Sequence, residues 1–161
     1  MLLEADKRGR KNAVAPLYPR GDEPFFVPEN VYVIGTMNIA DRSLALVDFA
    51  LRRRFAFLTL EPRFSDPSYR RWLRDRAMPE ALSQLVIQRL SALNERIAAD
   101  SQLGPAYRLG HSFFCPRGDD FSQLDIEWYR EIVATEIVPL LEEYWYDAPE
   151  KARAAEQDLL G

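Results

Sequence analysis

The sequence predicts an α/β segment followed by an all-helical segment, and two observations lead to this prediction. Residues 31–60 hold two short, continuous apolar runs separated by a stretch in which apolar residues have helical spacing. After Pro62 the apolar residues recur every three or four positions, which is typical of helices. We therefore expect the chain of 161 residues to form two domains, at residues 1–62 and 63–161.

Composition limits the class of protein. No apolar run approaches the roughly 20 residues that a membrane-spanning helix needs, so we expect no membrane span. The net charge of −4 gives no overall nucleic-acid signature. The single Cys115 excludes an intramolecular disulfide and fits a reducing cytoplasm, the expected location. Basic clusters at residues 7–11, 52–54 and 70–76 are local, and such runs are most often solvated faces.

The first thirty residues predict irregular structure. Residues 2–11 have the pattern of a helix end, and their abrupt apolar start suggests a chain that begins within a domain. Residues 13–30 contain four prolines and a Pro-Arg-Gly-Asp turn between two apolar pieces. We expect a short hairpin that pairs residues 14–17 with residues 25–27.

Residues 31–60 predict a strand, a helix and a second strand. Val31–Gly35 is a continuous apolar run, typical of a strand covered on both faces. Asp41 or Ser43 can cap the next helix by accepting from its free N–H groups. A second apolar run, Phe55–Leu60, follows that helix, so the three elements form a right-handed βαβ unit. The apolar stripe of the helix comprises Leu44, Val47, Leu51 and Phe55.

The helical segment begins with two predicted helices. Asp66-Pro67 starts a short basic helix that runs through Ala77. Pro79 starts a long helix, which Gly104-Pro105 breaks. The apolar positions of this long helix are Leu82, Leu85, Val86, Leu90, Leu93 and Ile97.

Two more helices complete the prediction. One starts near Asp125, and Pro139 must kink or split it because proline lacks an N–H donor and crowds the preceding turn. The other lies within residues 147–160. The face that the third helix should bury comprises Tyr129, Ile132, Val133, Ile137, Leu140, Leu141 and Tyr144.

Thr36 and Asn38 follow the first predicted strand. Ligands of open α/β sheets bind beyond the carboxyl ends of the strands, where both residues lie. The amide of Asn38 donates and accepts hydrogen bonds, so it can orient a water molecule or contact a phosphate oxygen. The same residue can also simply cap the turn between strand and helix.

Three consecutive arginines end the predicted helix. A helix from Ser43 to Arg54 spans about 18 Å, so Arg52–Arg54 emerge at the opposite edge of the sheet from Asn38. If both groups touch a nucleotide, the arginines must reach a pocket on a neighbouring subunit. Guanidinium suits that task because its planar fork grips phosphate oxygens. The arginines equally fit a helix C-terminus favoured by the helix dipole.

The stretch IGTMNIADRSLALVDFALRRRF resembles the region around sensor 1 and the arginine finger in AAA+ nucleoside triphosphatases. More narrowly, it resembles the McrB subfamily, the GTP-hydrolysing motor of modified-cytosine restriction systems. The run Met-Asn-x-Ala-Asp-Arg at residues 37–42 carries this resemblance, and VPENVYVIGT, LRRRFAF and LGHSFF also fit. The resemblance covers nearly the whole chain. Ile39 departs from it, since the family usually has Thr there.

The resemblance implies roles for particular residues. Asn38 would be sensor 1, which positions the attacking water opposite the γ-phosphate, and Asp41 and Arg42 would shape the site and the subunit contact. Arg53 and Arg54 match the finger region, and Asp48 would support them. The helices after Pro62 would form the AAA+ lid of a P-loop core.

The resemblance also implies a cofactor and partners. GTP or ATP with Mg²⁺ would bind the complete module, and Thr36, Arg108, His111 and Ser112 would lie near the nucleotide. His111 fits a plain loop role equally well. The partners would be neighbours in a homo-oligomeric AAA+ ring, a nuclease subunit of the McrC type, and DNA indirectly through the assembly.

Two motifs of a complete motor do not occur in this sequence. There is no G-x-x-x-x-G-K-[ST] loop and no apolar strand that ends in Asp-Glu. We therefore expect the C-terminal half of a motor module, which alone neither binds nucleotide tightly nor hydrolyses it. A split core should expose apolar edges at residues 31–34 or 55–60, which favours dimerisation or aggregation.

Two other functions remain open from the sequence. The chain fits a stand-alone interaction module that inserts a strand and a basic helix into a partner supplying the phosphate-binding half. It also fits, less well, a nucleic-acid binder that uses residues 70–76 with Tyr69 and Trp72.

Overall fold

The computed structural model describes residues 2–15, 17, 24–37, 52–116 and 124–161. The chain forms two compact units, Met1–Thr59 and Leu60–Gly161, which we call the N-terminal unit and the helical unit.

The start of the N-terminal unit differs from the helix end that the sequence predicts. Two 3₁₀ turns, η1 (Ala5–Lys7) and η2 (Arg10–Asn12), stand there instead. Gly9 lies between them with φ of +83°, a conformation that interrupts a right-handed helix and favours glycine. A Cβ at Gly9 would lie 2.7 Å from Oε1 of Glu29, so the end of that side chain would have to shift as well.

The predicted hairpin is confirmed at one residue pair. Val14 and Phe25 form an isolated antiparallel bridge. The N–H of Val14 donates to the carbonyl of Phe25 at 2.8 Å, and the return bond measures 2.9 Å. One bridge fixes the register of the two segments but does not extend into a ladder among the described residues.

The strands predicted at residues 31–35 and 55–60 do not appear among the described residues, which have no regular secondary structure there. A strand exists only through hydrogen bonds to a neighbour, and neither segment has such a neighbour in the described part of the chain. Their apolar side chains are exposed, with Tyr32 at 86%, Ile34 at 93% and Leu58 at 89%. The helix predicted between them lies outside the described residues, apart from residues 52–54.

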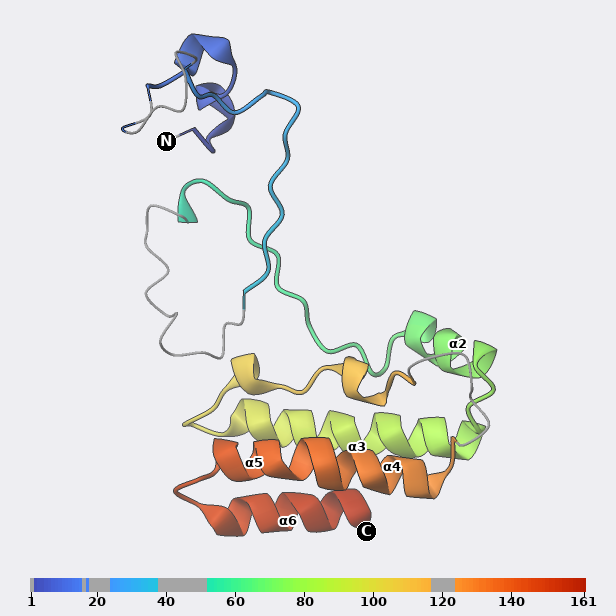
Figure 1. The fold of residues 1–161 in the computed structure, drawn as a ribbon. Helices are drawn as coiled ribbons and strands as arrows, with labels where there is room; N and C mark the ends of the chain where they lie inside the picture. The colour runs from blue at the N-terminus through green and yellow to red at the C-terminus, as the bar shows by residue number, and fades with distance from the viewer. Residues whose placement is uncertain (1, 16, 18–23, 38–51, 117–123) are drawn as a thin grey trace. The chain divides into compact units, whose positions relative to one another are not determined.

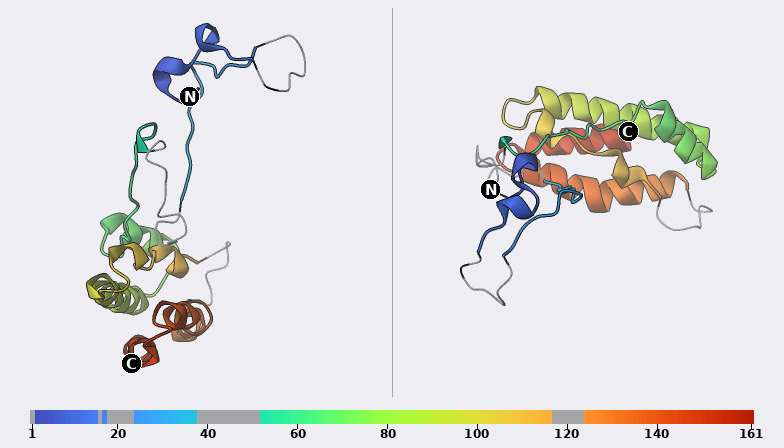
Figure 2. Two further views of the ribbon diagram at one scale, coloured as in Figure 1. Left: turned by 90° about the vertical axis from the view of Figure 1, so that its left-hand side faces the viewer. Right: turned by 90° about the horizontal axis from the view of Figure 1, so that it is seen from above.

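The helical unit contains the helices that the sequence predicts after Pro62 (Figure 1). The rod of α4 and α5 and the helices α3 and α6 lie side by side, and α2 lies at the start of α3 (Figure 2). The main helices are α2 (Pro67–Asp75), α3 (Glu80–Ala99), α4 (Ile126–Ile132), α5 (Val138–Tyr144) and α6 (Pro149–Leu160). Short turns are η4 (Pro105–Tyr107) and η5 (His111–Phe114), while the π-helical turn η6 (Val133–Ile137) joins α4 to α5.

Side-chain caps confirm where two of the helices begin. Asp66 accepts from the N–H of Ser68 at 2.8 Å at the start of α2. Asp125 accepts from the first N–H groups of α4 at 3.0 and 2.9 Å. The end of α2 falls at Asp75, two residues earlier than expected. Ala77 has φ of +56°, so the backbone leaves the helix there.

The predicted effect of Pro139 is confirmed. The chain forms one rod from Ile126 to Tyr144, but the π-helical turn η6 splits that rod just before Pro139. In this turn the N–H of Val138 donates to the carbonyl of Val133, five residues earlier. The wider turn gives room to the proline ring, which would clash with the carbonyl four residues before it in a regular α-helix.

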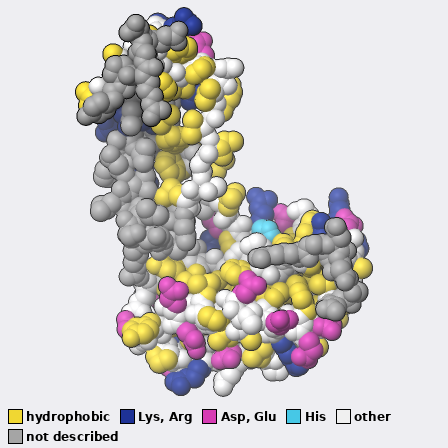
Figure 3. Space-filling model, in the orientation of Figure 1, with side chains coloured by type: hydrophobic (Ala, Val, Ile, Leu, Met, Phe, Trp, Pro, Cys, Tyr) yellow, Lys and Arg dark blue, Asp and Glu magenta, His cyan; other side chains and the backbone are white. Residues whose placement is uncertain are grey.

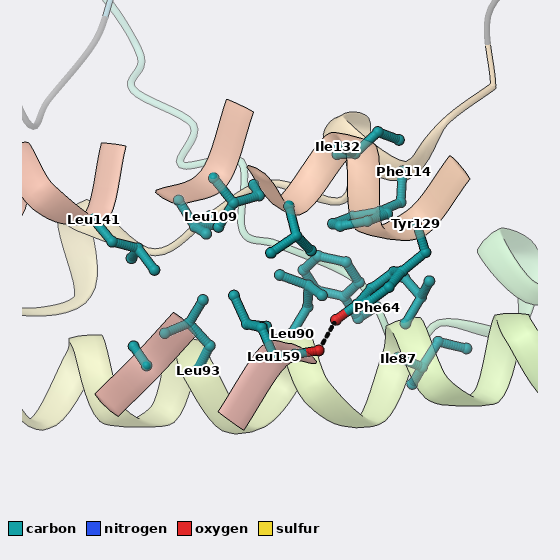
Figure 4. Packing of buried hydrophobic residues seen from close by; sticks show 14 of the residues in the cluster. Phe64, Ile87, Leu90, Leu93, Leu109, Phe114, Tyr129, Ile132, Leu141 and Leu159 are labelled. Carbon is teal, nitrogen blue, oxygen red and sulfur yellow. Dashed lines mark hydrogen bonds between the residues drawn. The ribbon is translucent and has the colours of Figure 1, made fainter. Parts of the chain in front are cut away.

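The core of the helical unit joins these elements (Figure 4). Leu90 of α3, Leu141 of α5 and Leu159 of α6 are each at most 1% exposed. Burying apolar surface contributes about 25 cal/mol per Å², so this cluster is the main stabilising contribution to the unit. The buried apolar positions predicted for α3 are confirmed, with the exception of Leu85, which is only partly buried.

Candidate functional site

The finger-region arginines differ in their surroundings within the N-terminal unit. Arg54 is partly buried and its Nε donates to Oε1 of Glu4 at 2.5 Å. Arg52 lies with its guanidinium carbon 5.9 Å from the centre of the Phe57 ring. Arg53 is exposed and makes no hydrogen bond or ion pair with another described residue. Arg52 and Arg53 are therefore both exposed without a carboxylate partner among the described residues, whereas Glu4 binds Arg54.

Of the other predicted site residues in the N-terminal unit, the structure describes Thr36 alone. Thr36 is exposed within the irregular segment 31–37. Asn38, Asp41, Arg42 and Asp48 lie outside the described residues.

Arg108 and His111 lie together in the helical unit, on the loop that follows α3. The guanidinium of Arg108 pairs with the carboxylate of Glu61, and its Nε donates to the carbonyl of Pro105 at 3.0 Å. Nδ1 of His111 accepts the backbone N–H of Arg63 at 3.3 Å. Both side chains therefore contact the segment that leads into α2. Ser112 is exposed in η5, one residue later.

Aromatic rings surround His111. Its ring centre lies 5.2 Å from that of Tyr69 and 6.2 Å from that of Phe64, in edge-to-face geometry. Tyr69 is buried and its hydroxyl donates to the carbonyl of Phe114 at 3.2 Å. Burial raises the pKa of the Tyr69 hydroxyl, so this group stays protonated and keeps donating.

Asn94 is a buried polar residue that the sequence reasoning missed. It lies in the second half of α3, and both ends of its amide bind the backbone of Leu109. The sequence does contain a sign of this role. Asn94 occupies a position of the apolar stripe, four residues after Leu90 and three before Ile97. A polar residue at a core position is kept only when its hydrogen bonds are satisfied, which marks it as a structural anchor.

A second missed cluster surrounds Asp100, at the end of α3. Its carboxylate accepts from Nζ of Lys151 at 2.7 Å and from Nε1 of Trp145 at 3.0 Å. It also accepts the backbone N–H of Gln102 at 2.8 Å. The Lys151 hydrogen bond, together with the other two, holds the pKa of Asp100 well below its usual value. The cluster ties α3 to α5 and α6.

Charge is distributed unevenly over the helical unit, with acidic side chains spread over the face seen in Figure 3. Residues 131–150 contain six acidic residues and neither Lys nor Arg. The basic helix α2 exposes Arg70, Arg71 and Arg74, which pair with no other described residue. Tyr69 is buried and the guanidinium of Arg76 covers Trp72 at 3.7 Å. Neither aromatic ring is free to stack on bases, so α2 fits an amphipathic lid element better than a nucleic-acid reader.

A shallow groove of about 330 Å³ lies between α5 and α6. Trp145 and Val138 contribute apolar surface, and Glu142, Glu156 and Arg153 contribute charge. Two carboxylates would repel a phosphate group, so the groove does not suit a nucleotide. The described part of the chain also holds no cluster of three or more His, Cys, Asp or Glu side chains suited to a metal ion.

Comparison with known proteins defines the class of the helical unit. A family model described as the McrB alpha-helical lid domain matches residues 85–153. The whole chain aligns over 163 residues, at 46% identity, with the Type IV methyl-directed restriction enzyme EcoKMcrB subunit of Escherichia coli (strain K12). The helical unit is thus a lid of this type. The chain is therefore an McrB-like AAA+ fragment, which confirms the resemblance seen in the sequence.

The alignment covers 100% of this chain and 36% of the E. coli protein, so the chain spans about a third of that relative's length. Among the described residues no helix is both long and apolar enough to cross a membrane.

Proposed function

We propose that the chain supplies the sensor, finger and lid parts of an McrB-like AAA+ motor that hydrolyses GTP or ATP in a modification-dependent DNA restriction system. The observation that carries this proposal is the 46% identity over the full chain. The alignment extends beyond the lid match at residues 85–153, because it covers the whole chain, residues 31–60 included. Residues 1–62 would belong to the α/β core and residues 63–161 to the lid.

The exposed apolar segments support assignment to an α/β core. Val33 and Ile34 in one segment, and Leu58 and Leu60 in the other, leave apolar area in water. Full burial of one such aliphatic side chain stabilises a fold by roughly 1.5–3 kcal/mol. A neighbouring strand that covers these side chains would therefore be held in place by their burial. Paired with such strands, these segments would become the two parallel strands that the sequence predicts.

In this assignment Asn38 is sensor 1, and it orients the attacking water through its amide. Thr36 lies at the same strand end, while Asp41 and Arg42 shape the site and the contact between subunits. Ser112 is exposed on the lid and is a candidate nucleotide contact. Mg²⁺ and the phosphates would be held chiefly by the loop and strand motifs that this sequence does not contain.

Arg53 is our choice for the arginine finger. A finger must reach a phosphate on a neighbouring subunit, so its guanidinium has to be exposed and free of a carboxylate partner. Of the two arginines that match the finger region, Arg53 meets this requirement among the described residues, whereas Glu4 binds Arg54. Arg54 would then hold the end of the helix in place, with Asp48 as a further support.

The partners follow from the same assignment. Ring neighbours of the same kind would complete each nucleotide site, since the sensor and the finger serve different pockets. A nuclease subunit of the McrC type would bind the ring and depend on its nucleotide hydrolysis. DNA would be contacted through the full assembly.

A chimera tests the proposal. The aligned part of the E. coli subunit is replaced by this chain, and nucleotide hydrolysis and restriction of methylated DNA in cells are measured against the unaltered subunit. We expect the chimera to retain both activities. Arg53→Ala should lower hydrolysis by about a thousandfold, the lower end of what fingers contribute. Arg52→Ala is the matched control and should retain hydrolysis.

Two results would count against the proposal. One is a chimera that assembles like the E. coli subunit but hydrolyses neither GTP nor ATP. The other is robust hydrolysis by the 161-residue chain alone. A partner that binds the chain and supplies a phosphate-binding loop, with no chimera activity, would favour the stand-alone interaction module instead.

A further inference from the structure

A polar contact inside the core fixes the loop that follows α3. Asn94 is 6% exposed and Leu109 is 2% exposed. Nδ2 of Asn94 donates to the carbonyl of Leu109 at 2.9 Å, and Oδ1 accepts the N–H of Leu109 at 2.6 Å. The side-chain amide thus replaces the backbone partner that Leu109 lacks, and it anchors this residue to the second half of α3.

The neighbours of Leu109 hold a second segment, residues 61–64. Arg108 pairs with the carboxylate of Glu61, and Nδ1 of His111 accepts the N–H of Arg63. Phe64 is 3% exposed and inserts into the core of the helical unit beside the His111 ring. Residues 61–64 therefore belong to the helical unit and connect it with the residues that precede them in sequence. We call Asn94, Arg108 and His111 the linker clamp.

Each residue of the linker clamp already makes hydrogen bonds within the helical unit. The guanidinium of Arg108 binds Glu61 through one nitrogen and the carbonyl of Pro105 through another. A phosphate brought to Arg108 would meet the Glu61 carboxylate, which repels it. The ring of His111 packs against Phe64 and Tyr69, and its Nδ1 is taken by Arg63.

We propose that Asn94, Arg108 and His111 are positioning residues, which fix residues 61–64 to the lid and do not touch the nucleotide. The lid then moves as one body with this linker, and its orientation is passed directly to the chain segment that carries the sensor and the finger. The catalytic part of this inference rests on the proposed function. The structural part rests on the contacts alone.

The structural part is tested on the 161-residue chain by amide hydrogen exchange at Arg63. His111→Ala removes the acceptor, so exchange of this amide should rise about tenfold or more. His111→Asn is the conservative variant, because its Oδ1 lies close to the position of Nδ1, and it should keep the protection. Arg96→Gln breaks an ion pair with Asp158 that does not involve the linker, and it should leave Arg63 unchanged.

The catalytic part is tested by kinetics of the chimera described above. Arg108→Gln should lower kcat by about ten- to hundredfold through misplacement, with KM for the nucleotide unchanged. Exchanging the two charges, with Glu61→Arg and Arg108→Glu together, should restore most of kcat. A residue that binds phosphate would behave differently, since Arg108→Gln would raise KM and the exchange would not restore activity.

The outcomes separate the two proposals. A chimera without any hydrolysis refutes the proposed function, while Arg63 exchange in the chain still decides the structural part. Arg63 exchange that is the same in His111→Ala and in the unaltered chain overturns the linker clamp. A raised KM without rescue by the charge exchange overturns the positioning role and makes Arg108 a nucleotide contact.

Discussion

The hydroxyl of Tyr129 in α4 donates a 2.9 Å hydrogen bond to the carbonyl oxygen of Leu159 in α6 (Figure 4). Tyr129 is fully buried, and burial raises the pKa of its hydroxyl, so the group remains a donor. The guanidinium of Arg89 in α3 donates to the same carbonyl. One backbone oxygen in α6 therefore accepts hydrogen bonds from side chains of α3 and α4. These bonds help to fix how the three helices pack.

Replacing Tyr129 tests this packing. Tyr129→Phe should lower the free energy of unfolding by about 1 kcal/mol, the usual net contribution of one hydrogen bond. The loss stays near that value because Arg89 still satisfies the carbonyl of Leu159. Urea unfolding of the chain measures the change. Tyr146→Phe is the control, since Tyr146 is 83% exposed and should have no effect. Equal stabilities of the two variants would contradict the expectation.

Asn94→Leu should destabilise the helical unit even though it makes the core more apolar. The substitution keeps a similar volume but leaves the N–H and carbonyl of Leu109 without their partner. Each buried unsatisfied group costs about 1–3 kcal/mol, so we expect a net loss of about 2 kcal/mol. Denaturant unfolding measures it, with Gln88→Leu on the exposed face of α3 as the control. If the variant is as stable as the unaltered chain, the pairing of Asn94 with Leu109 makes no net contribution to the free energy of unfolding.

Asp100→Asn should lower stability in a way that depends on pH. The folded-state pKa of Asp100 lies below its unfolded value, so its stabilising effect is present above the unfolded pKa of about 4. The effect is lost progressively as the pH falls toward the folded-state pKa. The melting temperature of the unaltered chain should therefore exceed that of Asp100→Asn at pH 7, and the difference should shrink below about pH 4. Asp158→Asn, at an exposed ion pair, is the control and should show little difference at either pH.

The exposed apolar segments of the N-terminal unit should make the chain self-associate. Ile34 and Leu58 are 93% and 89% exposed, and such surface favours contact with other copies. Sedimentation velocity over a range of concentrations should show association, and Ile34→Lys with Leu58→Lys should reduce it. Thermal unfolding of the helical unit should not change in this variant, since both residues lie in the N-terminal unit. A chain that stays monomeric throughout would argue against paired strands in this region.

Much of the helical unit was predictable because its signals are local. Proline and aspartate mark the starts of α2 and α4, and the apolar positions expected in α3 are buried, apart from Leu85. Pro139 acts within one turn of the chain, so its effect could also be read directly from the sequence.

The rest depends on partners distant in sequence, which a single sequence does not reveal. Residues 31–35 have the composition of a strand, but a strand forms only beside another strand. The side chains of Arg108 and His111 suggested a nucleotide contact by resemblance, and only the fold brings Glu61 and Arg63 to them. Asn94 stands within the apolar stripe of α3, and only the fold brings the backbone of Leu109 to its amide.

The π-helical turn at Val133–Ile137 has a consequence for deletions in this rod. Whether the rod can lose one residue there should depend on Pro139. A π turn equals one residue inserted into an α-helix, so deleting an exposed residue such as Ala134 would restore regular geometry without rotating either flank. That deletion alone would press the ring of Pro139 against a carbonyl oxygen. The rod without Ala134 should therefore fold only when Pro139 is also replaced by Ala. We expect the deletion and the substitution to occur together in any relative that has the shorter rod.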